Sequence, residues 1–359
     1  MPPEPAAPPA SPGPPAHPIA AGVLLVGLAA LTAACWWWTA PPAWMVAVHV
    51  ALPAVAALGL PIVAAVGWRA SGRRGLLPAA AGALAWSAVW GRGLVPVAEA
   101  PVGPTVRVLS WNVQRLGFED AETGPRTECV AAAIARFAPD VLLLQELSAR
   151  DVARLSARLG LTCAHADYRL TGDPGHGGVA ACARGDAFTL GEHGPRAFAP
   201  EIDWHYAWAE LLPVDGGQAI NLFSVHLQPY GGRLDARSDD VARVQHAEAD
   251  ALAARLARLQ DPTVVAGDFN SARDAPVHVR LRRLLRDVWE VGGAGLGATA
   301  QVAGGVPLRI DYLYASPHFR VSAVAVERPG CSDHDAVLAV LSRPAAPVGP
   351  QPKAPPSPR

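Results

Sequence analysis

Thr263-Val264-Val265-Ala266-Gly267-Asp268-Phe269-Asn270 is a short apolar run that ends in a carboxylate and an amide. A bounded apolar run of this length predicts a buried β-strand. The pattern recurs along the chain, because other apolar runs end in polar side chains at Asn112, at Glu146 and at His226. If these strands lie side by side, their ends assemble one acidic cluster that also contains imidazole.

Two further segments bring the same kinds of side chain. Asp311 lies inside Arg309-Ile310-Asp311-Tyr312, and Ser332-Asp333-His334 places a carboxylate beside an imidazole. Asp, Glu and Asn oxygens without thiolates suit Mg²⁺ or Mn²⁺ and fit Zn²⁺ poorly. Each segment alone has an ordinary structural explanation, such as a turn that uses the side chain of Asp268. The functional hypothesis therefore depends on the six segments occurring together.

The chain after Val106 mixes short β-type runs with helical ones. Helical periodicity is present in Ala131–Phe137, Ala149–Leu159 and Asp239–Leu259. Strands and helices mixed in this order predict a layered α/β domain. The predicted strands are Arg107–Asn112, Val141–Gln145, Val179–Ala183, Trp208–Leu212, Ile220–Val225, Thr263–Gly267, Ile310–Ala315 and Ala336–Leu341.

The order of the six segments resembles that of the endonuclease/exonuclease/phosphatase superfamily. The matching letters are SWNV, QE, VHL, GDFN, RIDY and SDH, spread over Val106 to about Leu341. The resemblance implies a four-layered α/β sandwich, in which two packed mixed β-sheets are flanked by helices and the site lies at one rim. It also implies that the protein is a metal-dependent hydrolase of phosphoric esters.

The resemblance further implies which residues bind the cofactor, Mg²⁺ or Mn²⁺. Glu146 matches the principal metal-binding carboxylate of the family. Asn112 matches an amide linked to the metal or to its water, and Asp333 matches a residue near the metal that is sometimes a second ligand.

Five positions match the catalytic machinery of the family. His334 matches the catalytic histidine, and Asp311 matches the carboxylate that orients it. Asp268 and Asn270 match the pair that positions the attacking water and the phosphate, while His226 matches a histidine that contacts a phosphate oxygen. Either Asp268 or His334 could take the proton of the water, and the sequence leaves both open.

The chain departs from the family pattern in two places. The family often has proline two residues after the last histidine, whereas here Asp335 and Ala336 follow His334. Asp335 adds negative charge beside the predicted site. The family also often has an aromatic residue after the threonine of its penultimate loop, and Thr299-Ala300 lacks it. Thr299 is therefore only a candidate substrate-loop residue.

The first hundred residues carry few charges, which favours a membrane-embedded region. They hold only six charged side chains, and apolar stretches occupy Ile19–Trp38, Trp44–Trp68 and Leu76–Val97. About 20 apolar residues suffice for a helix to cross the hydrocarbon core. Residues 18–98 are therefore predicted to form three transmembrane helices, with a buried helical hairpin as the alternative.

The predicted orientation follows from the short loops. Arg69, Arg73 and Arg74 lie between the second and third stretches, so the positive-inside rule places this loop in the cytoplasm. The expected localisation is thus a multi-pass protein of the cell membrane with an extracytoplasmic catalytic domain at 103–343. Residues 1–17 and 344–359, rich in proline, are predicted to be disordered tails.

The five cysteines show neither CxxC nor Cys/His zinc spacing. Cys35 lies in an apolar run, and the other four are Cys129, Cys163, Cys182 and Cys331. Buried free thiols are the favoured interpretation, and disulfides are the alternative if the domain faces an oxidising compartment.

The charge of the domain and the predicted transmembrane spans restrict the classes of substrate that we expect. Residues 102–345 contain 24 arginines and 29 acidic residues, a poor match for generic duplex DNA. The leading hypothesis is hydrolysis of a phosphate ester or pyrophosphate, with a lipid-linked substrate favoured because a tether raises encounters with headgroups. The alternative is a cell-surface nuclease, supported by four arginines at Arg280, Arg282, Arg283 and Arg286. A non-catalytic membrane protein that binds a phosphorylated ligand is the third hypothesis.

Overall fold

Two six-stranded sheets form the centre of the molecule in the computed structural model, which describes residues 55, 58–69, 72–91, 94–117, 124–169, 177–214, 216–229, 236–302 and 306–342. Sheet A runs in the order β13 (Arg320–Glu327), β14 (Ala336–Ser342), β1 (Thr105–Asn112), β2 (Val141–Leu147), β4 (Gly178–Arg184) and β3 (Leu161–Asp167). Sheet B runs in the order β5 (Phe188–Ala197), β6 (His205–Pro213), β7 (Ile220–His226), β8 (Thr263–Asp268), β12 (Asp311–Ala315) and β9 (Arg286–Asp287).

Both sheets are mixed. β1 pairs with β2 in parallel, and β7 pairs with β8 in parallel, whereas the other pairs are antiparallel. The eight strands predicted from the sequence are all present, and every one of them is interior to its sheet. The four edge strands β13, β3, β5 and β9 were not predicted.

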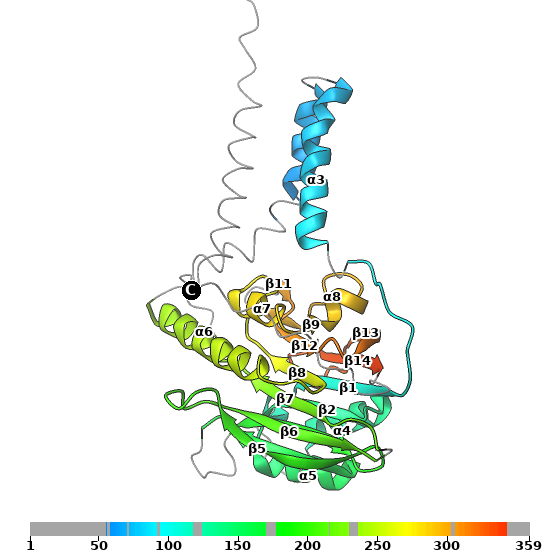
Figure 1. The fold of residues 1–359 in the computed structure, drawn as a ribbon. Coiled ribbons are helices and arrows are strands. Elements are labelled where there is room, and N and C mark those ends of the chain that lie inside the picture. The colour runs from blue at the N-terminus through cyan, green and yellow to red at the C-terminus, as the bar shows by residue number, and fades with distance from the viewer. Residues whose placement is uncertain are drawn as a thin grey trace, which may run out of the picture.

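Alternating side chains of the interior strands fill three separate apolar cores. Val108 of β1 points into the core between the sheets, whereas its neighbour Leu109 packs under the helices outside sheet A. Val264 and Val265 of β8 divide in the same way between the central core and the core outside sheet B. Three cores require four layers, so the structure has the predicted two-sheet sandwich (Figure 1).

Helices α4 (Pro125–Phe137) and α5 (Ala149–Leu159) cover sheet A, while α6 (Ala236–Leu256) and α7 (Pro276–Leu281) cover sheet B. Local sequence sets the ends of α5, because Ser148 and Asp151 form a capping box and Gly160 adopts a left-handed φ of 66° after the helix. The shorter elements are η1 (Gly72–Leu76), η2 (Gln114–Gly117), α8 (Val288–Gly292) and the hairpin of β10 (Ala300–Val302) and β11 (Val306–Leu308).

The predicted transmembrane helices, and with them the predicted membrane localisation, are contradicted. Within the described part of the chain, no helix is long and apolar enough to cross a membrane. Helix α3 (Leu77–Trp90), in the third predicted span, has only 14 residues, whereas a crossing needs about 20. Ile19–Trp38 and most of Trp44–Trp68 lie outside the described residues, as do the predicted tails at 1–17 and 344–359.

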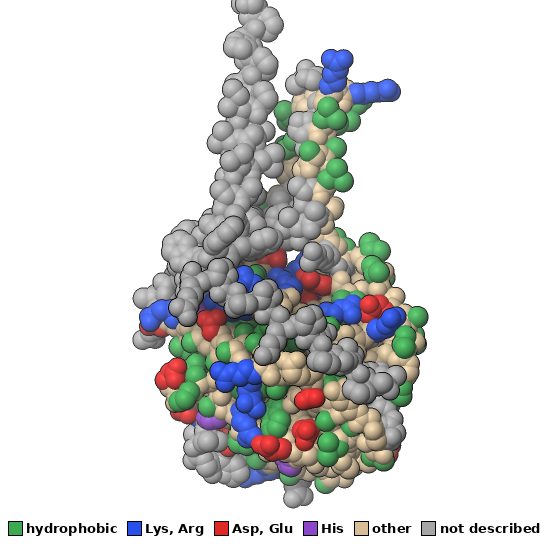
Figure 2. Space-filling view, viewed as in Figure 1, with side chains coloured by type: hydrophobic (Ala, Val, Ile, Leu, Met, Phe, Trp, Pro, Cys, Tyr) green, Lys and Arg blue, Asp and Glu red, His purple; other side chains and the backbone are tan. Residues whose placement is uncertain are grey.

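Apolar composition alone accounts for this error. Helix α3 and the helical residues 58–69 project from the sandwich (Figure 1), and many apolar side chains lie on their described surface, with basic side chains at the far end (Figure 2). Leu58, Ile62 and Leu84 are among the exposed ones. A hydropathy pattern does not register where a helix ends, so the third predicted span continues to Val97 although α3 ends at Trp90.

Candidate active site

Strand direction brings the polar strand ends together. The parallel pairs β1/β2 and β7/β8 place their carboxyl ends at one edge of each sheet, where Asn112 lies opposite Gln145 and His226 lies opposite Asp268. Strand β12 runs the other way, so its first residue, Asp311, pairs with Asp268 at the same edge. The site is therefore built at the rim that the two sheets share.

Asn112 joins the two sheets at this rim. Its side-chain nitrogen donates to Oε1 of Glu146 at 3.0 Å and to Oδ2 of Asp268 at 3.1 Å. Its oxygen accepts from the backbone N–H of Gln114 at 3.0 Å, which fixes the amide orientation. Asn112 is fully buried, so it holds two carboxylates from different sheets in one place.

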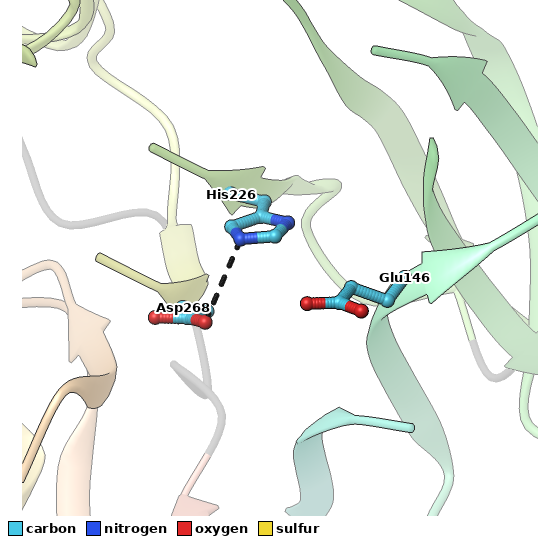
Figure 3. A group of neighbouring side chains, drawn as sticks. All are labelled: Glu146, His226 and Asp268. Atoms are coloured by element: carbon cyan, nitrogen blue, oxygen red, sulfur yellow. Dashed lines mark ion pairs between the residues drawn. The ribbon is translucent and has the colours of Figure 1, made fainter. Parts of the chain in front are cut away.

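Glu146 is presented by an irregular backbone. The register of β2 against β4 shifts between Gln145 and Leu147, and Glu146 between them has a left-handed φ of 59°. A residue other than glycine rarely adopts this conformation, which is found often at functional sites. The bulge aims the carboxylate of Glu146 away from the core and toward His226 and Asp268 (Figure 3).

His226 is buried and held from two sides. Its Nδ1 is hydrogen-bonded to the hydroxyl of Tyr168, and its Nε2 lies 3.6 Å from Oδ2 of Asp268. The backbone oxygen of His226 accepts from Nε1 of Trp204 at 2.6 Å. The imidazole therefore turns its Nε2 toward the carboxylate cluster (Figure 3).

Asp268 lies at the centre of the site. Burial raises the pKa of this carboxyl and the neighbouring charge of Asp311 raises it further, while His226 and His334 oppose the shift, leaving a pKa of about 6. One oxygen, Oδ2, faces Asn112 and both imidazoles, and the other accepts from the backbone N–H of Asn270 at 2.8 Å. Asp268 is thus a carboxylate that takes up a proton close to neutral pH.

His334 and Asp311 form a buried pair. Nδ1 of His334 lies 2.9 Å from Oδ2 of Asp311, and Nε2 lies 3.8 Å from Oδ2 of Asp268. Burial lowers the pKa of His334, but the carboxylates of Asp311, Asp268 and Asp333 outweigh it and raise the pKa to about 10. His334 is therefore an imidazolium at neutral pH.

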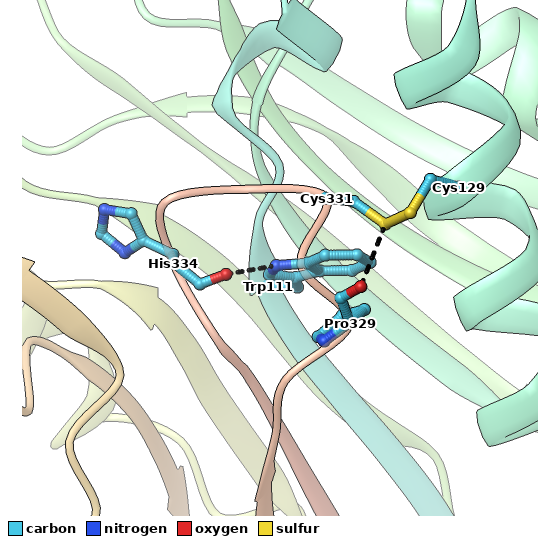
Figure 4. Close-up of a disulfide and its surroundings, with 5 residues drawn as sticks. All are labelled: Trp111, Cys129, Pro329, Cys331 and His334. Atoms are coloured by element: carbon cyan, nitrogen blue, oxygen red, sulfur yellow. Dashed lines mark hydrogen bonds between the residues drawn. A yellow bond between two sulfur atoms is a disulfide. The ribbon is translucent and has the colours of Figure 1, made fainter.

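The loop that carries His334 is fastened to sheet A and α4. Nε1 of Trp111 donates to the backbone oxygen of His334 at 3.0 Å, and a disulfide joins Cys331 to Cys129 (Figure 4). The hydroxyl of Ser332 donates to the backbone oxygen of Asn112 at 2.8 Å. These contacts come from β1 and α4, so two elements distant in sequence from His334 hold the loop that carries the imidazole.

The four described cysteines form disulfides, so the interpretation favoured from the sequence, buried free thiols, is wrong for them. Cys129 pairs with Cys331, and Cys163 of β3 pairs with Cys182 of β4. Pairing of partners 202 residues apart depends on the fold, which is why spacing alone did not reveal it. Cys35 lies outside the described residues.

The remaining predicted residues take different places. Asn270, which has a left-handed φ of 46°, donates its side-chain N–H to the backbone oxygen of Leu227 at 2.9 Å. Asp333 is exposed, and its carboxylate belongs to neither group of potential metal-binding atoms that the described residues form. Thr299 is fully buried, and its hydroxyl accepts from the backbone N–H groups of Ile310 and Asp311, so it fixes the start of β12.

Two contributors to the site were missed by sequence reasoning. Tyr168 contacts both Glu146 and His226, and Trp111 holds the loop of His334. Trp111 lies within a predicted strand beside Asn112 and could have been suspected from that position. Tyr168 follows the unpredicted edge strand β3, so no local pattern pointed to it.

The donor atoms of the site fit a divalent cation. Glu146, His226 and Asp268 offer ligand atoms within 4.8 Å of one another, and Asp268, Asp311 and His334 form a second such group. Oδ1 of Asp311 is buried without a hydrogen-bond partner, so negative charge at the rim is not fully compensated. Carboxylate oxygens with imidazole, and with all described cysteines in disulfides, match the preferences of Mg²⁺ and Mn²⁺ better than a thiolate-binding ion.

The fold is thus a two-sheet sandwich with a cluster of carboxylates and imidazoles at its rim. The chain belongs to the Endonuclease/Exonuclease/phosphatase family, whose model matches residues 109–334. Members of this family are generally hydrolases that act on phosphate esters. No curated protein matches the chain in sequence.

Solved structures share the fold at low sequence identity. An endonuclease/exonuclease/phosphatase protein from Bacteroides vulgatus is 16% identical with a TM-score of 0.56, and the match covers 67% of this chain and 99% of that one. The human Nocturnin catalytic domain with bound sulfate is 20% identical with a TM-score of 0.54 (68% and 95% covered). A mannosyl-6-phosphatase from Bacteroides thetaiotaomicron is 18% identical with a TM-score of 0.53 (66% and 99% covered).

Proposed function

We propose that this protein is a divalent-metal-dependent phosphoesterase that hydrolyses a phosphate ester or pyrophosphate. The observation that carries the proposal is the convergence on one atom, Oδ2 of Asp268. The amide of Asn112 lies 3.1 Å from it, and the Nε2 atoms of His226 and His334 lie 3.6 Å and 3.8 Å from it. A phosphoryl group bound beside this oxygen would meet the Nε2 atoms of His226 and His334.

Glu146, with Asn112 beside it, would hold the cation, which is Mg²⁺ or Mn²⁺ in this proposal. When bound, such an ion neutralises phosphoryl oxygens and stabilises the leaving oxygen. Asp268 lies within reach of the same position. Asp333 is proposed to act at longer range, since its negative charge contributes to the raised pKa of His334.

The two pKa shifts support a division of the proton-transfer roles between Asp268 and His334. Asp268, with a pKa of about 6, is the proposed base that accepts a proton from the attacking water, because a base works best with a pKa near the operating pH. His334, with a pKa of about 10, is already charged at neutral pH and cannot serve as that base. Its imidazolium stabilises negative charge on the phosphoryl group, and Asp311 keeps it protonated and oriented.

Asn270 and His226 complete the proposed site as phosphate-positioning residues. Asn270 follows Asp268 through a tight turn, so its backbone N–H fixes the base while its side chain lies at the rim. His226 would direct Nε2 toward a phosphoryl oxygen. Positioning of this kind lowers the barrier by fixing the reacting atoms before the chemical step.

The nature of the group esterified to the phosphate is the finer part of the proposal. The case for a lipid-linked substrate rested on the transmembrane spans, and it loses that support. The case for a nuclease rested on the arginines near α7, but Arg280, Arg282 and Arg286 are paired with Asp250, Glu290 and Glu99. Figure 2 shows basic and acidic side chains intermixed on this face, so the proposal favours a substrate other than duplex nucleic acid.

A substrate panel tests the proposal. Purified full-length protein with Mn²⁺ is incubated with a sugar phosphate, a nucleotide, a phospholipid, a polyprenyl pyrophosphate and plasmid DNA, beside a His334→Ala variant. Release of phosphate or alcohol from one class, lost in the variant, supports the proposal and names the class. Nicking of plasmid alone supports the nuclease alternative, and no hydrolysis by folded, metal-loaded protein counts against the proposal.

A further inference from the structure

Tyr168 lies between two residues of the proposed site, although it comes from the loop after the edge strand β3. Its hydroxyl accepts from the backbone N–H of Glu146 at 3.0 Å and is hydrogen-bonded to Nδ1 of His226. The ring is almost fully buried, with 4% of its surface exposed. One side chain thus connects the bulge of β2 in sheet A with the end of β7 in sheet B.

The ring of Tyr168 is held firmly. Trp204 stacks on it with a centroid separation of 4.6 Å and an interplanar angle of 5°. The backbone oxygen of Tyr168 accepts from the backbone N–H of His205 at 3.0 Å, and its N–H donates to Gly177 at 3.0 Å. Since ring and backbone are both fixed, the hydroxyl has little freedom to move away from His226.

One direction of the hydrogen bond to His226 satisfies both neighbours of the Tyr168 hydroxyl. A tyrosine hydroxyl has one hydrogen to donate and lone pairs that accept. Here one lone pair accepts the N–H of Glu146, and the hydroxyl hydrogen can then be donated to Nδ1 of His226. A neutral imidazole that accepts at Nδ1 carries its proton on Nε2.

We propose that Tyr168 is a positioning residue that donates its hydroxyl hydrogen to Nδ1 of His226 and thereby keeps the proton of this imidazole on Nε2. Nε2 then presents an N–H to the rim, where it faces Oδ2 of Asp268 at 3.6 Å. The inference deepens the proposed function, because an N–H at this place is the form of His226 that can donate to a phosphoryl oxygen. With the other tautomer, Nε2 would offer a lone pair and repel that oxygen.

Tyr168→Phe tests the inference with little change in shape. Phenylalanine keeps the ring that stacks on Trp204 and removes only the hydroxyl. Tyr314→Phe is the matched control, since the hydroxyl of Tyr314 also lies 2.8 Å from Nδ1 of a buried histidine, His278, which is not part of the proposed site. Loss of a partner that orients an active imidazole typically costs about tenfold, so kcat of Tyr168→Phe should fall about tenfold.

A double-mutant cycle asks whether Tyr168 acts through His226. In a His226→Ala background, adding Tyr168→Phe should change kcat by less than about threefold, because the residue it positions is gone. An equal tenfold loss in both backgrounds would overturn the inference and assign Tyr168 a purely structural role. Tyr314→Phe should leave kcat within about twofold of the wild type, and a tenfold loss there would equally count against the specific role.

Nitrogen NMR of histidine-labelled protein tests the tautomer without any activity. The signal of His226, identified by its absence in His226→Ala, should show a protonated Nε2 and an unprotonated, hydrogen-bonded Nδ1, and Tyr168→Phe should shift the Nδ1 resonance. A proton on Nδ1 in the wild type, or no shift in the variant, overturns the inference. If the wild type hydrolyses no phosphate ester, the proposed function fails while the nitrogen shifts still decide this one.

Discussion

Asp311→Asn is the substitution that isolates the charge of the His334 pair from its geometry. The carboxylate of Asp311 is fully buried and accepts from Nδ1 of His334 at 2.9 Å. An asparagine oxygen can accept the same hydrogen bond, and the side chain keeps its size. The change therefore removes one negative charge from beside the imidazole while the hydrogen bond can persist.

The magnitude follows from the pKa of His334. A rise from 6.5 to about 10 corresponds to about 5 kcal/mol in favour of the imidazolium, since one pKa unit is worth about 1.4 kcal/mol. Three carboxylates share this effect, and Asp311 is the largest of them and the only one in hydrogen-bond contact. Half of the total, about 2–3 kcal/mol, corresponds to proton binding by His334 that is about 30- to 150-fold weaker, so the variant keeps its imidazolium at pH 7 and should lose about tenfold in kcat/KM at pH 9.

The assay is the hydrolysis of the substrate class that the panel identifies, measured with Mn²⁺ between pH 5.5 and 9. In the wild type, His334 stays charged over this range. In Asp311→Asn the charges of Asp268 and Asp333 remain and the pKa of His334 falls only part of the way, so the deficit should be small at pH 7 and grow toward pH 9, where the imidazole loses its proton. Asp186→Asn, an exposed change of the same kind, is the control. A folded Asp311→Asn protein with at least a third of wild-type activity at pH 9 would refute the reasoning.

Two further predictions concern stability. Burial raises the pKa of Glu248 from 4.5 to about 8, against a hydrogen bond from Gln228, so the folded state loses stability as pH rises from about 4.5 to 8. Glu248→Gln should be more stable than the wild type by up to ~3–5 kcal/mol at pH 8.5, and the two proteins should have similar stability at pH 5. Urea unfolding at both pH values measures the difference, and a difference that does not change with pH would contradict this prediction. Replacing Cys129 and Cys331 by serine opens a disulfide across 202 residues and should lower the free energy of unfolding by about 5 kcal/mol and reduce kcat. Opening Cys163–Cys182, 19 residues apart, should lower it by about 3 kcal/mol and leave kcat nearly unchanged. Thermal unfolding and rate measurements on both variants check this, and equal losses of kcat would argue against the link between the first disulfide and His334.

The sequence revealed the strands that are buried on both faces. Val141–Leu147 and Thr263–Asp268 read as continuous apolar runs because each side packs into a core. The edge strand Phe188–Ala197 alternates irregularly and is mostly open to solvent, so it carries no such run. Strand β3 is also a partly exposed edge strand without a continuous apolar run, so neither β3 nor Tyr168, which follows it, was predicted.

The candidate site was predictable where a polar side chain ends an interior strand. Asn112, Glu146, His226 and Asp268 could be grouped on that basis, since parallel neighbours end at the same rim. Long-range contacts could not be foreseen, because the disulfide of Cys331 and the hydrogen bond of Trp111 to His334 join segments more than 200 residues apart. The predicted membrane helices failed for a different reason, since composition does not show where a helix ends.

The most direct test of the central claim is the initial rate of phosphate-ester hydrolysis as a function of free Mn²⁺ for EDTA-treated wild type and Glu146→Gln. Glu128→Gln, an exposed change on α4, serves as the matched control. The account predicts no hydrolysis without metal, full recovery with Mn²⁺ in the wild type and the control, and at least a tenfold weaker response in Glu146→Gln. Undiminished hydrolysis after removal of metal, or a Glu146→Gln protein that responds to Mn²⁺ like the wild type, would contradict it.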